Sequence, residues 1–527
     1  MLDMVKCVPA YRREDIEATI AINLARGLPS PDYGTQRGAI NICGNGPSLR
    51  ERYPTSGKVA ACNGAWRALH RAGVFVDYII VHDPTPENAS WFDDAPVYAQ
   101  YLLASRVHPS VFDKLAGRDI RIWHCGDGPE ERAVPAGPFI GIAATVGLSA
   151  MNLLAGMGFR HFDCWGLDSC YAYDGAHHAT PQDWAESEPL PYQVGKRMFL
   201  ASLWMVGQVQ EGLKQIEANR RDYTVEIHDD GLFAEALAHN TLEVVYDLDK
   251  APGSFDFIHA GLNIESYRRE HGYTRVKVHC RRGKGKDGFR TNEPIELDHN
   301  HKQHMMNYVV RPLQKMFGFQ EVDAVGEQAM EFGYSPKPVL QAFSAGTSLP
   351  TFQPSVEAEL WALKEFPEPP LVITLREIFY WPQRNSNVEA WLEFAKGLQK
   401  EGRVIILRDT WKRDEPLDGF ETCRDAVIDL HKRFALYRRA KMNFFVMNGP
   451  AALCHYTADV PYMTFLKDAP GYPCYDPKFL QDFIGIEPYG QFPWTSDRQR
   501  LVYADDTCEN IAKAWNELQQ SAGSIAA

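Results

Sequence analysis

Short, mostly apolar runs alternate with longer amphipathic segments along most of the chain. The first run spans residues 39–43 and stops at Gly44-Asn45-Gly46-Pro47, a cluster that neither a strand nor a helix interior accepts. Later runs of this kind predict strands over residues 59–62, 78–81, 101–104, 120–123, 162–165, 242–246, 275–279, 371–375, 404–407, 426–430, 443–446 and 461–466. Strands that alternate with helices indicate an α/β protein with mostly parallel sheets.

The amphipathic segments between these runs predict helices. A helix over residues 145–157 is rich in small residues and ends at Gly158, and residues 191–218 are expected to form one long helix. Further helices are predicted over residues 13–26, 65–72, 254–271, 305–316, 387–400, 432–440 and 510–520. Residues 336–369 are rich in proline and are expected to connect two halves of the chain.

The length of 527 residues corresponds to about three domains at roughly 150 residues each. We expect a lead-in over residues 1–37 and a first Rossmann-like domain over residues 38–238. Two further α/β lobes are expected over residues 239–365 and 366–527.

Four predicted strands of the first domain end in a small or polar residue. These ends are Gly44-Asn45, Asn63, Asp83 and Asp168. In an open parallel sheet the carboxyl ends of the strands form the ligand site, so the four ends are expected to face one crevice. The alternative is that Asn and Asp only start turns, as they often do.

The glycine-rich turn after the first strand is a candidate phosphate site, because glycine lets a phosphate approach backbone N–H groups closely. The pattern is not the dinucleotide fingerprint, since it has no third glycine at the required spacing, and no Gly-Lys-Ser/Thr of a P-loop follows it. The alternative is an ordinary tight turn after a core strand.

A polar, aromatic and histidine-rich loop follows Asp168. Tyr171 and Tyr173 can donate hydrogen bonds to phosphate oxygens, and His177 or His178 can act as a general base near neutral pH. The alternative is that both histidines are inert surface residues. A metal site would need a third ligand that the sequence does not nominate, so no metal is expected.

Composition and charge narrow the class of protein. Hydrophobic residues make up 45%, charged residues 23% and aromatic residues 12%, which is typical of a globular protein. The net charge of -13 argues against broad nucleic-acid binding as the function. The eleven cysteines form no C-x-x-C pair, and the sequence has no apolar run of membrane-spanning length and no signal-peptide core. We therefore expect a soluble, reduced, cytoplasmic protein, with peripheral membrane association still allowed.

The N-terminal domain resembles one shared by bacterial CMP-sialic-acid sialyltransferases, motility accessory factor glycosyltransferases and archaeal 6-hydroxymethyl-7,8-dihydropterin pyrophosphokinases. The matching pieces are GNGPSL at 44–49, CN at 62–63, HDP at 82–84, a Thr-x-Gly helix start at 145–147, GLD at 166–168 and HHA at 177–179. The resemblance implies a Rossmann-like, sialyltransferase-like domain of the GT-A-variant type.

This resemblance also implies roles for single residues. His178 would be the general base, with His177 and Asp168 beside it as further catalytic candidates. The implied nucleotide- and donor-binding residues are Gly44, Asn45, Gly46, Pro47, Ser48, Asn63, Asp83, Thr145, Gly147, Tyr171 and Tyr173.

The C-terminal part, about residues 240–520, resembles inverting glycosyltransferases of the two-lobed GT-B type, such as heptosyl- and fucosyltransferases. The pieces that carry this resemblance are VITLRE at 372–377, RNSN at 384–387 and NGPAAL at 448–453. The resemblance implies a GT-B-like pair of Rossmann-like lobes. Arg376, Asn448, Gly449 and Pro450 would then contact the donor of this second module.

The expected function is that of a glycosyltransferase that transfers a CMP-activated nonulosonic acid to a surface glycan, glycolipid or flagellin. The expected partners are a nucleotide sugar and a glycan or protein acceptor, with no tightly bound cofactor and no nucleic acid. Two alternatives remain open. The first is an ATP- and Mg²⁺-dependent pterin pyrophosphokinase in which Asp83 and Asp168 hold the metal. The second is a chain in which one module is a non-catalytic scaffold.

Overall fold

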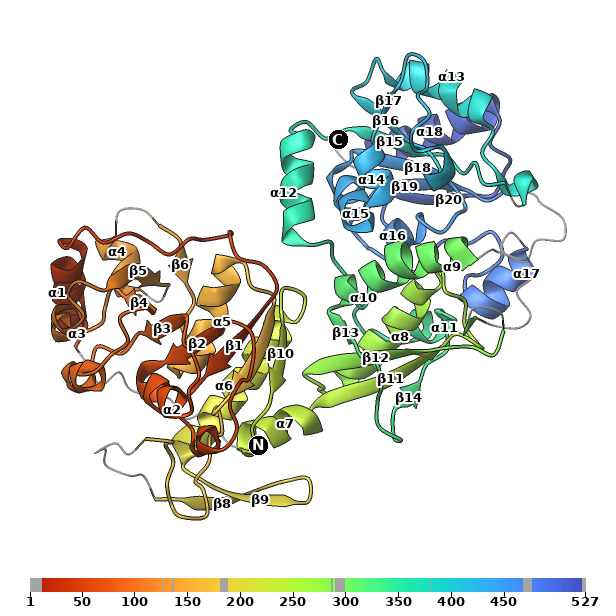
Figure 1. Cartoon of the computed structure of the whole chain (residues 1–527). Helices are drawn as coiled ribbons and strands as arrows, with labels where there is room; N and C mark the ends of the chain where they lie inside the picture. The colour runs from red at the N-terminus through yellow and green to blue at the C-terminus, as the bar shows by residue number, and fades with distance from the viewer. Residues whose placement is uncertain are drawn as a thin grey trace. The chain divides into compact units, whose positions relative to one another are not determined.

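The computed structural model describes residues 12–126, 128–134, 137–180, 188–285, 288–289, 299–379, 381–467 and 476–523. The chain divides into two compact units, Met1–Thr241 and Leu242–Ala527 (Figure 1). Both units are built on parallel sheets with helices on their faces, so the predicted α/β class with Rossmann-like modules is confirmed. The domain boundaries drawn from the sequence stay predictions.

The first unit contains an eight-stranded sheet in the order β10-β7-β1-β2-β3-β4-β5-β6. All neighbouring strands in it run parallel. The strands are β1 (Ala39–Cys43), β2 (Val59–Cys62), β3 (Tyr78–Val81), β4 (Gln100–Ala104), β5 (Asp119–Cys125), β6 (Phe139–Ile140), β7 (His161–Trp165) and β10 (Thr224–Ile227). Because β1 pairs with both β2 and β7, the turns that follow these three strands lie at the same edge of the sheet.

Helices cover both faces of this sheet, as a parallel sheet requires. They are α1 (Arg13–Leu24), α2 (Trp66–Arg71), α3 (Pro109–Lys114), α4 (Pro129–Ala133), α5 (Val146–Met157), α6 (Leu203–Asn219) and α7 (Leu232–His239). Helix α5 begins at Thr145, whose Oγ1 accepts the Leu148 N–H at 3.2 Å, and ends at Gly158 with φ +116°. Its small residues let it pack closely on the central strands.

The single helix predicted over residues 191–218 is wrong in its first third. The structure has an antiparallel hairpin there, β8 (Leu190–Val194) and β9 (Arg197–Ala201), followed by α6. Gly195 takes a left-handed conformation at φ +56° between the strands, which a hairpin turn uses readily. Ser202 then caps α6, with its Oγ accepting the Met205 N–H at 3.3 Å.

The second unit contains two sheets. A four-stranded sheet in the order β13-β12-β11-β14 consists of β11 (Thr241–Asp247), β12 (Arg275–Arg281), β13 (Phe319–Glu321) and β14 (Met330–Glu331). A six-stranded sheet in the order β17-β16-β15-β18-β19-β20 consists of β15 (Leu371–Thr374), β16 (Val404–Leu407), β17 (Glu421–Thr422), β18 (Met442–Val446), β19 (Tyr462–Phe465) and β20 (Gln499–Val502). We call the parts built on these sheets the first lobe and the second lobe.

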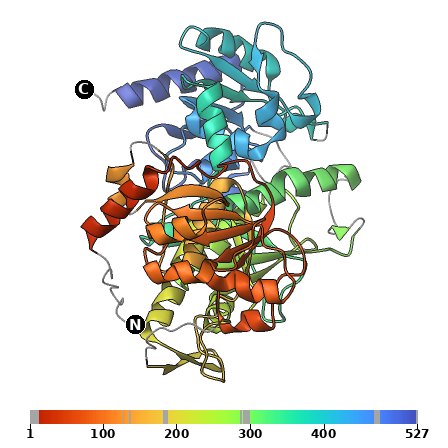
Figure 2. The ribbon, with the colours of Figure 1, turned by 60° about the vertical axis from the view of Figure 1, so that its left-hand side comes forward.

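The strands of the six-stranded sheet are apolar on both faces. In β15, Ile373 packs into the cluster that holds α13 (Val388–Leu398) and α18 (Cys508–Gly523), whereas Val372 packs into the cluster that holds α15 (Leu430–Arg439). Helices α13 and α18 lie side by side (Figure 1, Figure 2). The remaining helices of the unit are α8 (Phe257–Glu270), α9 (His299–Met305), α10 (Arg311–Phe317), α11 (Lys337–Ser344), α12 (Val356–Glu365), α14 (Arg424–Ile428), α16 (Ala452–His455) and α17 (Pro477–Phe479).

One prediction about the second unit is wrong. Residues 426–430 are not a strand, because helix α14 occupies most of this run and Asp429 then caps α15. The Asp429 Oδ1 accepts the His431 N–H at 2.9 Å. The proline-rich stretch at 336–369 lies between the strands of the two sheets and contains helices α11 and α12. A short apolar run does not by itself distinguish a buried helix from a strand.

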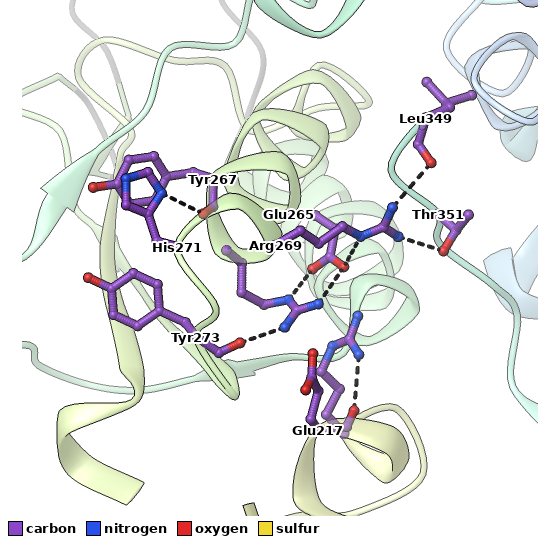
Figure 3. A network of polar contacts seen from close by, with 10 residues as sticks. Glu217, Glu265, Tyr267, Arg269, His271, Tyr273, Leu349 and Thr351 are labelled. Atoms are coloured by element: carbon purple, nitrogen blue, oxygen red, sulfur yellow. Dashed lines mark hydrogen bonds and ion pairs between the residues drawn. The ribbon is translucent and has the colours of Figure 1, made fainter. Parts of the chain in front are cut away.

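A buried charge network ties helix α8 to the connection that follows the first lobe (Figure 3). Glu265 is fully buried and accepts two hydrogen bonds from Arg268, at 2.8 and 3.1 Å, and one from Arg269 at 2.9 Å. Arg269 also donates to the Leu349 carbonyl at 3.3 Å and to the Thr351 Oγ1 at 3.0 Å. The Glu265 carboxylate therefore orients both arginines, and Arg269 links α8 to Leu349 and Thr351.

Within the described ranges, no helix combines the length and the apolar character that a bilayer crossing needs.

We expect Glu265→Gln to lower the free energy of unfolding by about 3 kcal/mol, because removing one partner leaves a buried charge uncompensated. The measurement is denaturant unfolding of the full chain followed by tryptophan fluorescence. The matched control is Glu393→Gln, whose partner Lys396 lies at 3.0 Å in a pair that is more than 60% exposed, and it should change stability by less than about 1 kcal/mol. Equal losses in the two variants would contradict the assigned role of Glu265.

Candidate functional site

The glycine turn after β1 packs against the turn after β7. The Gly44 N–H donates to the Trp165 carbonyl and the Gly46 N–H donates to the Gly166 carbonyl, both at 2.8 Å. A Cβ on Gly44 would lie 2.4 Å from the Gly166 oxygen, and one on Gly46 would lie 2.1 Å from Asp168 Oδ2. These two N–H groups and the space beside them are therefore used for packing rather than left open to a phosphate.

Asp168 stabilises this packing. Its Oδ2 accepts the Ser48 N–H at 3.1 Å and the Ser48 hydroxyl at 2.9 Å, at the start of the 3-10 turn Pro47–Arg50. Burial raises the pKa of the Asp168 carboxyl. Burial and the neighbouring Asp168 carboxylate raise the pKa of Asp229 to about 7, although the Gly231 and Leu167 N–H groups donate to it.

The histidine loop folds back onto the same turn. The Ala179 N–H donates to the Asn45 carbonyl at 2.7 Å, and the Thr180 hydroxyl donates to Asn45 Oδ1 at 3.1 Å. The rings of His177 and His178 lie 4.1 Å apart. Burial, together with His177, lowers the pKa of His178 to about 4, so its imidazole is neutral near pH 7 and is a weaker base than an exposed imidazole.

Asn63 and Asp83 meet at the ends of neighbouring strands. The Asn63 Nδ2 donates to Asp83 Oδ2 at 2.9 Å, and His82 Nε2 lies 3.2 Å from Asp83 Oδ1. Burial would raise the pKa of Asp83, but His82, Asn63 and Arg106 lower it below its usual value. Asn63 itself adopts φ +50°, a conformation that asparagine tolerates better than most residues.

Several buried polar atoms near these strand ends have no hydrogen-bond partner among the described residues. They are Asn45 Nδ2, Asn63 Oδ1, His82 Nδ1 and both amide atoms of Asn88. Asn88 is only 1% exposed. Buried polar groups normally find partners, so these atoms are available to a bound molecule or water.

The other predicted residues of the first unit have different positions. Thr145 uses its hydroxyl to cap α5, and a Cβ on Gly147 would lie 2.6 Å from the Leu167 side chain, so both serve packing. Tyr171 is half-buried with its ring 5.4 Å from His177, whereas the Tyr173 side chain is fully exposed.

The second unit contains a cavity of about 880 Å³ between its two lobes. Arg376 lines it from the loop after β15, and Asn448, Gly449 and Pro450 line it from the turn after β18. The four residues predicted for this module therefore meet in one cavity at the carboxyl ends of parallel strands, where α/β folds bind ligands. A Cβ on Gly449 would lie 2.3 Å from the Phe255 ring, so this glycine allows the first lobe to approach the second.

Among the described residues, four arginines line the cavity, and these four belong to the second lobe: Arg376, Arg384, Arg408 and Arg433. We call this set the arginine wall. The Arg408 guanidinium donates to both carboxylate oxygens of Glu377, at 2.9 and 2.6 Å. Arg433 donates to the Ala426 and Val427 carbonyls at 2.8 and 3.0 Å, and Arg376 donates to Asn385 Oδ1 at 2.6 Å. These contacts hold the cationic groups in defined positions.

A carboxylate faces the cavity from the first lobe. The Ser254 hydroxyl donates to Asp256 Oδ2 at 2.6 Å, and His259 Nδ1 lies 3.9 Å from Asp256 Oδ1. Burial lowers the pKa of the His259 imidazole despite the nearby Asp256 carboxylate. The Asp256 side chain is 42% exposed and thus accessible to a substrate hydroxyl.

Sequence reasoning did not single out most of these cavity residues. Arg408 follows the end of β16 as Arg376 follows β15, and that shared position was a signal that could have found it. Arg433 lies inside α15 and Asp256 directly before α8, where no local pattern distinguishes them from solvated charges. Within the described parts of the chain, no group of three His, Cys, Asp or Glu side chains forms a metal site.

Comparisons with known proteins find one family model and similar solved structures. Residues 28–174 match the model of the family described as 6-hydroxymethylpterin diphosphokinase MptE-like. No curated protein matches the sequence. The structure is similar to that of the MAf glycosyltransferase from Magnetospirillum magneticum AMB-1, at 15% identity over 43% of this chain and 38% of that chain, with a TM-score of 0.33. It is also similar to the E. coli ADP-heptose lps heptosyltransferase II, at 11% identity over 91% of this chain and 98% of that chain, with a TM-score of 0.24.

The family match begins before β1 and ends in the loop after β7, so it contains the glycine turn and Asp168. The resemblances inferred from the sequence, to this family and to the two kinds of glycosyltransferase, are confirmed as resemblances. This chain spans 38% of the length of the MAf glycosyltransferase.

We expect Gly46→Ala to destabilise the chain by about 1–3 kcal/mol, because the new methyl group overlaps Asp168 Oδ2 and the Gly166 oxygen. The control is Gly207→Ala in α6, where a Cβ meets no atom within 4 Å. That change should be neutral or stabilising by up to about 1 kcal/mol. Thermal unfolding of the two variants measures the difference, and a lower midpoint for Gly207→Ala than for Gly46→Ala would contradict it.

The raised pKa of Asp229 predicts a pH dependence of stability. Well below pH 3.8 Asp229 is protonated in both states; between about pH 4 and 7 the unfolded chain has largely lost this proton while the folded chain keeps it. The contribution of Asp229 to the free energy of unfolding therefore falls as pH rises to about 7, and Asp229→Asn should remove this fall. The measurement is the unfolding midpoint of variant and wild type between pH 4.5 and 8.

The control for this pH profile is Asp230→Asn, a change in the adjacent, exposed aspartate. The stability of Asp229→Asn relative to wild type should increase with pH, whereas that of Asp230→Asn should not. Parallel profiles for Asp229→Asn and wild type would contradict the raised pKa.

Proposed function

We propose that this chain is a glycosyltransferase that binds a nucleotide-activated sugar in the cavity of its second unit. One observation carries the proposal: a cavity at the carboxyl ends of parallel strands is lined by four described arginines and Asp409 from the second lobe and by Asp256 from the first lobe. Guanidinium groups fit the anionic groups of an activated sugar, and an opposed carboxylate fits the role of a base.

The arginine wall would hold the leaving group. Arg408 and Arg433 are already oriented by Glu377 and by backbone carbonyls, so little reorganisation is needed when negative charge develops on a phosphate. Trp381 and Trp411 line the same side and offer flat surfaces for a nucleobase. A diphosphate, or a phosphate together with the carboxylate of a nonulosonic acid, would satisfy this arrangement.

Asp256 would act as the general base. Its Oδ2 is bound by Ser254, which leaves Oδ1 to accept the proton of an acceptor hydroxyl. The acceptor oxygen then forms a bond to the anomeric carbon, and the bond from that carbon to the phosphate oxygen breaks, with its electron pair going to the phosphate. A single displacement of this kind inverts the anomeric configuration, and a positioned base contributes about 10²–10⁴-fold to the rate.

A CMP-activated nonulosonic acid is the donor we propose first, with a surface glycan, glycolipid or flagellin as the acceptor. A second donor site in the first unit is a candidate as well. The unpartnered atoms of Asn45, Asn63 and His82 favour it, and the neutral imidazole of His178 would be its base. In this second reading the second unit would be a non-catalytic clamp.

The pterin pyrophosphokinase alternative has the family match in its favour, because the matching family is described as a 6-hydroxymethylpterin diphosphokinase. It requires Mg²⁺ held by Asp83 and Asp168. Both carboxylates already accept hydrogen bonds, from Asn63 and from Ser48 respectively. Consumption of ATP with a pterin alcohol, lost on addition of a chelator, would favour this alternative.

The test is calorimetric titration of the full chain with CMP, UDP, GDP and ADP, followed by nucleotide release from the corresponding sugar donors. Arg376→Gln should weaken nucleotide binding at least about tenfold, because a charge-assisted contact is lost. His178→Ala should leave binding unchanged. The reverse pattern would move the donor site to the first unit, and binding of none of the nucleotides would overturn the proposal.

Asp256→Asn should lower kcat about 100-fold or more while nucleotide affinity stays the same, because the general base is removed. The control is Asp482→Asn, which changes an exposed aspartate of the same unit that does not line the cavity. Equal rates for Asp256→Asn and wild type would exclude Asp256 as the base.

A further inference from the structure

The side of the cavity that faces the arginine wall has a different chemistry. Its residues come from three elements: the segment before α8, the region of α9 with the π-helical turn Met306–Val310, and α17 with the π-helical turn Leu480–Ile484. Phe255, His304, Tyr308, Phe479 and Phe483 line the cavity from these elements, and we call them the aromatic wall. Among the described lining residues, none from these elements is a lysine or arginine.

The α17 segment belongs to this wall because it packs on the first lobe. The Ser335 hydroxyl donates to the Phe483 carbonyl, and the Phe483 ring lies 5.4 Å from Tyr334 and 6.4 Å from His259. Phe479 stacks on Phe483 with ring centroids 5.0 Å apart and an angle of 15° between the rings. Phe479 and Phe483 are therefore held against the first lobe while both line the cavity.

The exposed faces of this wall are suited to a ring rather than to a charge. His304 and Tyr308 are stacked with centroids 4.5 Å apart, and Tyr308 is 50% exposed. Aromatic side chains offer apolar area at a low cost in conformational entropy, and sugar rings present apolar C–H faces. The Asp256 carboxylate stands beside this surface and would repel a second anion that has no cation to pair with.

We propose that the acceptor is a neutral, ring-containing polyol, such as a glycan terminus without carboxylate or phosphate, bound by the aromatic wall. The inference rests on the proposed function, since it assigns the donor to the arginine wall. Charge then separates the two substrates: the anionic donor has the four described arginines, with Asp409 beside Arg408, and the acceptor meets aromatic rings and the Asp256 carboxylate. This separation also disfavours entry of the donor in the wrong orientation.

The first experiment compares matched acceptors on the full-length chain, using the donor that the nucleotide titration selects. The pairs are methyl β-glucoside with methyl β-glucuronide, and methyl β-galactoside with methyl β-galacturonide. Each pair differs only in whether C6 carries a hydroxyl or a carboxylate. The neutral member of at least one pair should accelerate nucleotide release, with kcat/KM at least about tenfold above that of its acidic partner.

The inference would be overturned if the neutral and acidic acceptors had equal kcat/KM or if the acidic one had the higher value. It would also be overturned if the donor bound but no neutral glycoside accelerated nucleotide release. The donor dissociation constant is measured separately by titration. If no donor binds, the proposed function is contradicted. If the donor binds but the acidic acceptor is preferred, only the present inference about the acceptor is contradicted.

The second experiment tests the wall itself. Phe483→Ala should raise the acceptor KM about tenfold, because it removes an aromatic anchor, and the donor dissociation constant should not change. The control is Tyr489→Ala, which removes a 70% exposed aromatic residue of the same unit that does not line the cavity. If Phe483→Ala fails to fold, Tyr308→Ala replaces it, since Tyr308 is half exposed.

A third variant is measured by its acceptor preference, which a mere loss of packing would not reverse. Tyr308→Arg adds a cation to the aromatic wall and should shift the preference toward the acidic member of each pair by about tenfold or more. An unchanged acceptor KM in the alanine variants, or an unchanged preference in Tyr308→Arg, would overturn the assignment of the acceptor to this wall.

Discussion

Parallel strand pairing is the constraint on which the rest of this structure depends. In a parallel sheet every strand ends at the same edge, so residues far apart in the sequence meet there without any specific contact to bring them together. Pairing of β1 with β2 and β7 places the turns at Gly44, Asn63 and Gly166 next to one another. Pairing of β15 with β16 and β18 does the same for Arg376 and Arg408 in the second unit.

The two units use similar turns in different ways. In the first unit, Gly44 and Gly46 allow two loops to pack together. Asp168 stabilises this packing by accepting a hydrogen bond from the Ser48 hydroxyl. In the second unit, Gly449 permits the approach of Phe255, and the turn that contains it still lines an open cavity. A glycine-rich turn after a strand therefore predicts a close approach, and whether backbone or ligand makes that approach depends on the neighbouring loop.

The arrangement of charge in the cavity follows from how its arginines are anchored. Glu377 binds Arg408 from behind, and the carbonyls at the end of α14 bind Arg433, so neither guanidinium has to be ordered when a ligand arrives. The opposite side is made of aromatic rings that stack on one another and on the first lobe. Under the function proposed here, one side would stabilise a leaving group while the other orients a neutral hydroxyl.

The sequence alone determined the class of fold and most of the strands. Buried strands of a parallel sheet are apolar on both faces, and the runs at β1, β2, β3, β15, β16 and β18 carried that signal in their composition. The turns at their ends were also visible, because Gly, Asn and Asp at a strand end are local features. Arg376 and the turn at Asn448 could also be found from the sequence, because they follow predicted parallel strands, whose ends form ligand sites.

Tertiary structure decided which of these residues remain open to a ligand. The pattern around Asp168 did not show that Ser48 would occupy its carboxylate, and nothing near Asp256 or Arg433 in the sequence showed that both face one cavity. The sequence predicts helix where β8 and β9 form a hairpin, because a short run of apolar residues fits either period over a few positions. The physical reason is common to these cases: burial, pairing and the neutral state of His178 come from contacts between residues distant in sequence, and local composition does not encode them.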